Sequence, residues 1–197
     1  MEYALVETNW ILREKYKGIN EHYKSLNQAC ESIEGVKFIG LYRPLNEIWH
    51  WTSFTTAKTL EEWRNVDRES NRLNPDFDDN VSYTMSRIYI GNDQGKQPPP
   101  IRDPESLKYL VLTLGFVSDA VGIRDLVLQR YEQFEGLEDA GILGVFQPMT
   151  ESWNYALVKM HNTMKRYTEI GQEWRRTYPH IPEITSSIER IYERYEA

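Results

Sequence analysis

The chain of 197 residues is 40% hydrophobic and 13% aromatic, which supplies apolar material for one large or two small folded domains and excludes a disordered chain. Its net charge of −7, with no cluster of Lys and Arg, argues against nucleic acid as a partner. The longest mostly apolar run, Tyr109–Val117, is too short to cross a membrane, so no membrane partner is expected. With a single cysteine, Cys30, and no signal-peptide pattern, the sequence predicts a cytoplasmic protein without an intramolecular disulfide.

The first half of the chain alternates between strand and helix patterns in the order βαββαβ. Apolar residues at spacings of three and four predict an amphipathic first helix, which ends at Gly35. Thr59 and Glu62 form a capping box that opens the second helix, and Pro75 follows its end. The predicted strands lie at 3–8, 36–42, 47–54 and 81–90, and the predicted helices at 13–34 and 59–74.

The second half repeats this order, with predicted strands at 107–114, 141–147, 151–160 and 184–192. Helices are expected at 118–134 and, capped by Asn162, at 164–174. Residues 104 positions apart match in the hairpins of the two halves, and the alignment at the front pairs Ala4 with Leu110. The identical pairs are Pro44 and Pro148, Glu47 and Glu151, and Trp49 and Trp153. Shared strand composition is the alternative explanation.

Three consecutive prolines at 98–100 form a stiff connector between the halves. The predicted division is therefore a first repeat at 1–91, a Pro-rich linker at 92–106 and a second repeat at 107–197. The predicted fold class is α+β: two tandem ferredoxin-like βαββαβ units whose sheets face each other as an α+β barrel. The barrel forms within one chain or between two, so the expected state is a monomer or a homodimer.

Alternation along the predicted hairpin strand sends Trp49 and Trp51 to one face of the sheet and His50 to the other, toward the helices. Trp153 and Tyr155 take the same positions in the second half. These four aromatic side chains are expected to fill the space between the two sheets, and the alternative is an aromatic-lined ligand cavity.

The order of elements over nearly the whole chain resembles the dimeric α+β barrel superfamily, which includes antibiotic-biosynthesis-type monooxygenases, haem-degrading enzymes, and chlorite-dismutase-like, NIPSNAP-like and EthD-like proteins. The run Leu-Glu-Glu-Trp-Arg-Asn-Val-Asp at 60–67 is similar to the second-helix motif of the monooxygenases. In the haem-degrading branch, an Asn on the first strand, this Trp and a later His form the site. Asn9 and Trp63 match the first two, but no His follows Trp63 at the required distance. The resemblance therefore implies no cofactor, with haem as the alternative.

His50 is the predicted catalytic residue, because an imidazole inside a strand can act as a general base near neutral pH or as a haem ligand. The alternative is a half-buried His bonded to a backbone group. The other histidines lack metal-ligand spacing, and residues 76–79 are expected to be a solvated loop, so no metal site is predicted. The predicted ligand-binding residues are Asn9, Trp10, Trp63 and Tyr83.

The sequence lacks the Gly-rich phosphate loop that kinases and dinucleotide-dependent enzymes use and the Gly-x-Ser-x-Gly element of serine hydrolases. These three classes of enzyme are therefore not expected. The predicted function is binding, or oxidative conversion, of a small hydrophobic or aromatic ligand in a pocket between the helices and the sheet of the first repeat. If the protein is an enzyme, we expect a cofactor-independent or haem-associated activity like that of the monooxygenases. The alternative is a non-catalytic ligand-binding or assembly module.

Overall fold

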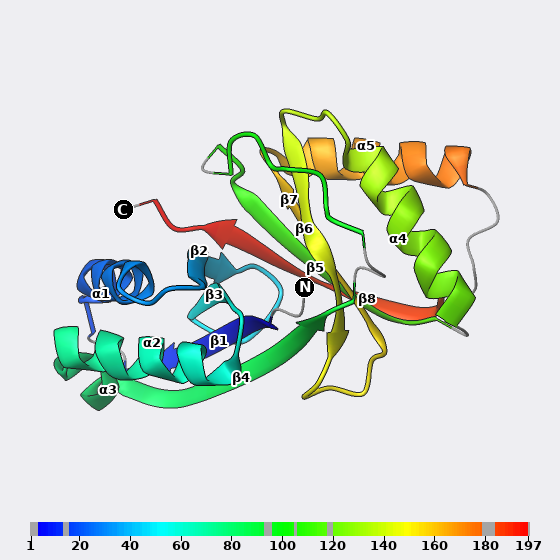
Figure 1. The fold of residues 1–197 in the computed structure, drawn as a ribbon. Helices are drawn as coiled ribbons and strands as arrows, with labels where there is room; N and C mark the ends of the chain where they lie inside the picture. The colour runs from blue at the N-terminus through cyan, green and yellow to red at the C-terminus, as the bar shows by residue number, and fades with distance from the viewer. Residues whose placement is uncertain are drawn as a thin grey trace. The chain divides into compact units, whose positions relative to one another are not determined.

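The computed structural model describes residues 4–13, 16–92, 96–104, 106–117, 120–178 and 184–196. The chain divides into two compact units, Met1–Ile90 with Tyr195–Ala197, and Gly91–Arg194. Each unit carries a four-stranded antiparallel sheet with helices on one face (Figure 1). The predicted α+β class with ferredoxin-like units is confirmed. How the two sheets are placed against each other stays a prediction.

The first unit has the strand order β2-β3-β1-β4 of a ferredoxin-like sheet. Helices α1 and α2 pack side by side over this sheet (Figure 1). Helix α2 begins with the predicted capping box: the amide of Glu62 donates to the Thr59 hydroxyl over 3.2 Å, and the amide of Thr59 donates to the Glu62 carboxylate over 2.8 Å. The elements are β1 (Ala4–Leu12), α1 (Ile19–Glu31), β2 (Val36–Pro44), β3 (Trp51–Ala57), α2 (Leu60–Leu73), α3 (Asp76–Asp79) and β4 (Val81–Gly91).

The second unit has the same strand order, β6-β7-β5-β8. Its elements are β5 (Tyr109–Val117), α4 (Ala120–Phe134), β6 (Ala140–Pro148), β7 (Tyr155–His161), α5 (Met164–Thr177) and β8 (Ile184–Arg194). Helix α5 is capped by Thr163, whose hydroxyl accepts from the amide of Arg166 over 3.0 Å. The predicted cap, Asn162, lies one residue before the observed cap. No helix in the described parts of the chain is long and apolar enough to span a membrane.

Residues of the two sheets are equivalent when they occupy the same position in the strand pairing of their own unit. Gly40 and Gly144 are one such pair, because each has a positive φ (152° and 157°) where the pairing of its strand shifts register. Strand pairing also makes Ala4 equivalent to Tyr109, since both lie opposite the last residue of the neighbouring strand. The predicted match of Ala4 with Leu110 is therefore wrong by one residue.

Both hairpins depart from the prediction in the same way, because β3 and β7 begin four residues later than expected. The residues before them form loops whose glutamates bind arginines of the last strand. Arg87 donates to Glu47 over 3.1 Å, and Arg190 donates to Glu151 over 3.0 Å. These ion pairs, which occur in both units, hold the glutamates off the strand and fix the loops.

Trp51 and Tyr155 also lie on the face of their sheets opposite to the predicted one. Trp51 packs in the core beneath α1, with Trp10 and Leu26, and Tyr155 packs in the core beneath α4 and α5. The prediction that Trp51 and Tyr155 fill the space between the two sheets is therefore wrong. Trp49 lies in the loop before β3 and stacks on Tyr83, and Trp153 contacts Phe116.

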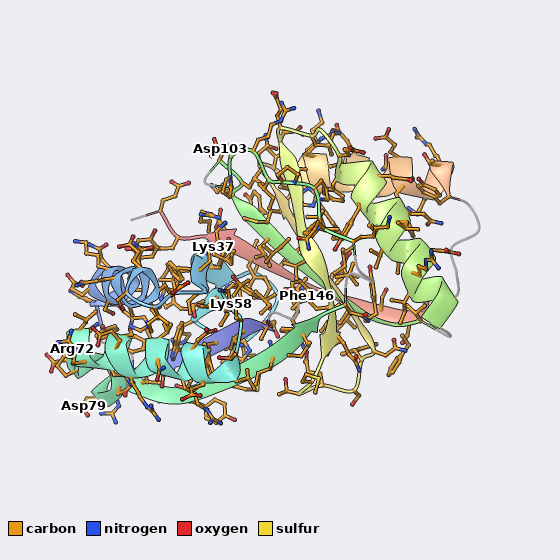
Figure 2. The ribbon with its side chains drawn as sticks, viewed as in Figure 1. Lys37, Lys58, Arg72, Asp79, Asp103 and Phe146 are labelled. Carbon is orange, nitrogen blue, oxygen red and sulfur yellow. The ribbon has the colours of Figure 1, made fainter. Side chains whose placement is uncertain are left out.

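Residues 76–79, expected to be a solvated loop, form helix α3 because Phe77 anchors them. Phe77 is 1% exposed and stacks on the ring of His22 with 3.3 Å between centroids. The polar side chains of this region project outward, including Arg72 of α2 and Asp79 of α3 (Figure 2). Arg72 also donates to Glu69 over 2.8 Å. One apolar side chain in an acidic run is therefore enough to fix this segment to the core.

Candidate functional site

The five predicted site residues do not meet in one place. Asn9 is buried on the face of the sheet away from the helices, where it accepts from Thr52 over 2.6 Å and donates to Glu7 over 3.0 Å. Trp10 is buried beneath α1, Trp63 is partly buried on α2, and Tyr83 is exposed on β4. The structure brings together only Trp10 and His50, through a hydrogen bond from the His50 amide to the Trp10 carbonyl at 3.0 Å.

His50 precedes β3 and is exposed, so the prediction that it lies inside a strand and faces the helices is wrong. Its Nδ1 accepts from the amide of Leu12 over 3.1 Å. The equivalent Asn154 accepts from the amide of Val117 over 2.9 Å and donates to the Val117 carbonyl over 2.8 Å. Both side chains thus tie a loop to the end of the first strand of their unit. A catalytic role for His50 stays a prediction.

The second unit contains a cavity of about 340 Å³ between its helices and the helix-side face of its sheet. Buried side chains form its floor and exposed ones its mouth. The lining residues are Thr113, Arg130, Lys159, His161, Tyr167, Thr168, Ile170, Gly171, Trp174, Arg175, Ser187 and Glu189.

Long side chains hold α4 and α5 apart at this cavity. The Arg130 guanidinium lies 3.6 Å from the centroid of the Trp174 ring, and the Gln133 amide donates to the Ile170 carbonyl over 2.6 Å. In the first unit Ser70 takes the place of Trp174, and its hydroxyl lies 3.2 Å from that of Ser25 on α1. Small side chains therefore let α1 and α2 pack together, whereas α4 and α5 leave space for a ligand.

Lys159 points from β7 into this cavity and is almost completely buried. Its Nζ lies 3.6 Å from a carboxylate oxygen of Glu189 and 4.9 Å from the centroid of the Tyr167 ring. Burial and the nearby Arg130 guanidinium lower the pKa of Lys159 to about 8, although Glu189 opposes this shift. Lys159 is thus mostly charged at neutral pH but can lose its proton close to it.

Glu189 lies at the mouth of the cavity with both carboxylate oxygens engaged. Tyr167 donates to one oxygen, and Thr113 donates to the other over 3.2 Å. Burial raises the pKa of Glu189, but Lys159 and these hydrogen bonds outweigh burial and lower it overall. Burial and the same carboxylate raise the pKa of Tyr167. At neutral pH Glu189 is therefore ionised and Tyr167 keeps its proton.

His161 closes the floor of the cavity and is 0% exposed. Neither ring nitrogen has a hydrogen-bond partner among the described residues. Burial, and then the positive charges of Lys159 and Arg166, lower the pKa of His161 to about 3. The imidazole is therefore neutral at physiological pH and keeps one donor and one acceptor unused.

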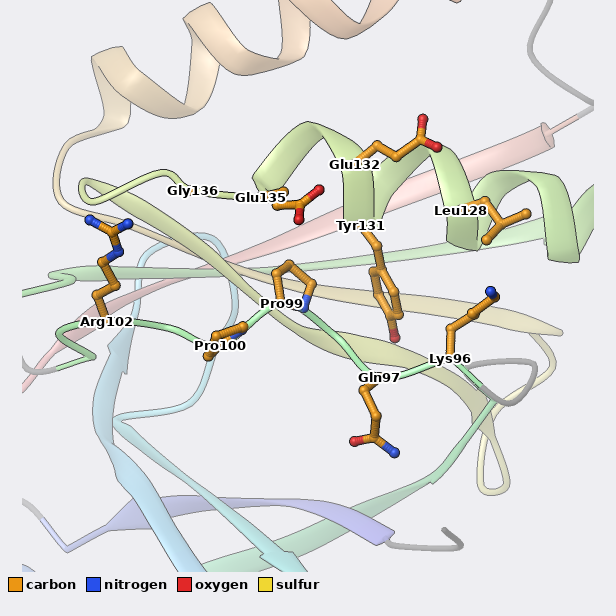
Figure 3. Close-up of a pocket in the computed structure, with 10 residues that line it drawn as sticks. All are labelled: Lys96, Gln97, Pro99, Pro100, Arg102, Leu128, Tyr131, Glu132, Glu135 and Gly136. Carbon is orange, nitrogen blue, oxygen red and sulfur yellow. The ribbon is translucent and has the colours of Figure 1, made fainter.

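A second cavity, of about 640 Å³, lies between the linker and α4 in the same unit. Tyr131 projects from α4 toward the linker residues, with Pro99 and Gln97 on the other side (Figure 3). Its rim mixes cations and carboxylates, and Arg102 pairs with Glu138 over 2.6 Å. This cavity holds no comparable set of buried polar groups, so the space between α4 and α5 is the stronger candidate site.

Sequence reasoning missed Arg130, Lys159, His161 and Glu189. One signal was available: Lys159 interrupts the apolar β7 on the face that also carries Tyr155, where a solvated charge is not expected. The rest depends on how far α4 and α5 are separated, which no periodicity reports. No group of three or more His, Cys, Asp or Glu that could hold a metal ion occurs among the residues that the structure describes.

No protein-family model matches the sequence. No curated protein matches it either. Solved structures do match the fold over most of both chains. The crystal structure named "putative monooxygenase from Lactobacillus acidophilus" has a TM-score of 0.66 at 7% identity, and the match covers 98% of this chain and 94% of that one.

Several other matches are named as chlorite dismutases. A mutant chlorite dismutase from Candidatus Nitrospira defluvii has a TM-score of 0.63 at 7% identity, covering 98% of this chain and 91% of that one. The structure named "Putative Chlorite dismutase" has a TM-score of 0.62 at 9% identity, covering 99% and 96%. At these identities the likeness shows the fold alone: the chain has the ferredoxin-like α+β fold of chlorite dismutase-like and monooxygenase-like structures.

Proposed function

We propose that the second unit binds a small, partly aromatic molecule in the cavity between α4 and α5. His161 is the observation that carries this proposal. A buried polar group left without a partner costs about 1–3 kcal/mol, and both nitrogens of this imidazole lack one among the described residues. Both nitrogens are covered by neighbouring side chains, so a ligand that recovers this cost must move these neighbours aside to hydrogen-bond His161. The aromatic side chains of Tyr167 and Trp174 supply the apolar wall that such a ligand needs.

Gly171 supports the same site from the opposite wall. It lies within α5 with no positive φ, so the backbone does not require glycine. A Cβ added there would meet only the Arg175 side chain, at 3.9 Å. Glycine inside a helix costs roughly 0.5–1 kcal/mol relative to alanine. Gly171 therefore keeps the cavity open and lowers the stability of α5, although its backbone conformation does not require glycine.

Oxidative conversion of the bound molecule is the second candidate, favoured by Lys159. Its free amine, populated near neutral pH, can accept the proton of a phenol or enol and leave an electron-rich anion beside Arg130. Deprotonation of this kind prepares an aromatic ring for attack on oxygen without a cofactor. The monooxygenase name of one structural neighbour agrees with this candidate.

Haem, the alternative cofactor, does not fit these residues. The neutral His161 ring has the chemistry of an axial ligand. However, about 340 Å³ lies at the low end of the range of roughly 300–1,000 Å³ for ligand pockets, which suits one or two rings. The contacts of Arg130 with Trp174 and of Gln133 with Ile170 also tie the two helices together across the space that a tetrapyrrole would need.

A panel of one-ring and two-ring aromatic compounds, screened by thermal shift and then by isothermal titration calorimetry, tests the proposal. Gly171→Leu fills the cavity without replacing any of its polar groups and should abolish binding, whereas Gly171→Ala should retain it. His50→Ala is the matched control for the predicted first-unit site and should leave binding unchanged. Loss of binding in His50→Ala with retention in Gly171→Leu would move the site to the first unit. Failure of every compound to bind the wild-type protein would overturn the proposal.

A further inference from the structure

We infer that the ligand of this cavity is an anion, a ring compound carrying a carboxylate that the guanidinium of Arg130 and the ammonium of Lys159 hold together. This inference rests on the proposed function and specifies the chemical class of the ligand. It follows from the charges of the cavity, the geometry of Arg130 and the contrast with the first unit.

The charges of the cavity floor are not balanced by the protein. Arg130 and Lys159 are both buried there, and Arg175 adds a third cation at the mouth. Glu189 is the one carboxylate among the lining residues. Its side chain is 38% exposed, and its oxygens already accept from Tyr167 and Thr113. Buried charge without a counter-ion is costly, so a ligand that brings a negative charge is favoured.

Arg130 is oriented to receive a planar anion. One face of its guanidinium is covered by the Trp174 ring at 3.6 Å, and Nη1 donates to Gln133 over 3.0 Å. No carboxylate among the described residues pairs with it, and its buried Nε has no acceptor there. Gln133 and the Tyr155 hydroxyl engage part of the fork, and the remaining N–H groups lie in the guanidinium plane, where a carboxylate can bind through parallel hydrogen bonds.

The first unit shows that the fold does not require these charges. Thr55 is equivalent to Lys159, and Ser86 is equivalent to Glu189. The Ser86 hydroxyl lies 3.4 Å from that of Thr8, which is equivalent to Thr113. Neutral side chains therefore satisfy one another at the same positions of the same sheet. The charged set of the second unit needs another explanation, and an anionic ligand supplies one.

Paired probes of equal shape test the inference: benzoate against benzamide, and 1-naphthoate against 1-naphthamide, titrated calorimetrically at pH 7 and low salt. We expect each carboxylate to bind at least tenfold more tightly than its amide. Lys159→Met and Arg130→Lys should each reduce this ratio, the first by removing a charge and the second by removing the fork. Lys165→Met, on the exposed side of α5, is the matched control and should preserve the ratio.

The outcomes separate the inference from the proposed function. Equal binding of acid and amide, lost in Gly171→Leu, would keep the cavity as a ligand site and overturn its assignment to anions. A carboxylate preference that survives both Lys159→Met and Arg130→Lys would overturn it as well. Absence of binding by all four probes would contradict the inference and the proposed function together. Circular dichroism of each variant shows whether a lost ratio reflects a lost fold.

Discussion

Replacing Lys159 with methionine should make the folded protein more stable. Lys159 is 7% exposed, so solvent does not screen it. At ~1.4 kcal/mol per pH unit, the fall of its pKa from 10.5 to about 8 means that holding the ammonium inside the folded protein at pH 7 costs about 3 kcal/mol. Methionine fills a similar volume without charge. Glu189 loses its ammonium neighbour but keeps two hydrogen bonds, so we expect a net gain of about 1–3 kcal/mol.

The pH dependence of this gain identifies its origin. At pH values above 10.5 the amine is neutral in both the folded and the unfolded chain, so it costs nothing. As the pH falls from 10.5 toward 8, the unfolded chain takes up its proton first, and the wild-type protein loses stability that the variant keeps. Urea denaturation of Lys159→Met and wild type between pH 7 and 10.5 measures the difference, with Lys165→Met as the surface control. A variant less stable than wild type, or a difference that does not change with pH, would refute the reasoning.

Three further predictions concern stability. Burial lowers the pKa values of His22 and His161 from 6.5 to about 3, so the free energy of unfolding should fall below pH 6.5 by ~1.4 kcal/mol per pH unit for each ring. Urea titrations of His161→Leu should show a shallower dependence of stability on pH in acid. An unchanged slope would contradict this prediction. Glu151→Gln weakens a nearly buried ion pair and should cost about 1–3 kcal/mol of stability. Glu69→Gln, in a pair whose arginine is 67% exposed, should cost much less because solvent screens the pair. Equal losses by calorimetry would argue against this prediction. Gly171→Ala should gain about 0.5–1 kcal/mol in the same assay, and a loss would mean that α5 needs glycine there.

The order of elements could be predicted because it depends on local patterns. The capping box at Thr59, the glycine that ends the first helix and the apolar periodicities act over a few residues each. The hairpin boundaries could not be predicted, because Glu47 and Glu151 are held off the strands by arginines far along the chain. The face of Trp51 could not be predicted either, because alternation shows which residues share a face of a strand but not which face the helices cover.

The candidate site is harder to predict from the sequence than the order of elements. The sequence predicts a catalytic His50 because alternation places this titratable side chain inside a strand, but β3 begins after it. Lys159 does interrupt a strand, and burial there lowers its pKa. The orientation of Arg130 depends on Trp174, whose ring covers one side of the guanidinium. This arrangement depends on the packing of two helices, and a single sequence does not report it.

The hydrogen bonds made by His50 and Asn154 bear on how strictly the fold constrains its loop junctions. Two different side chains close the same junction, because the junction asks only for an acceptor within reach of one strand-end amide. The backbone framework therefore tolerates different side chains at this position, provided that each offers an acceptor. Thr55 and Lys159, which are also equivalent, differ in charge and not merely in shape. The two units thus keep the same hydrogen bond at their loop junctions and differ in charge on the helix side of their sheets.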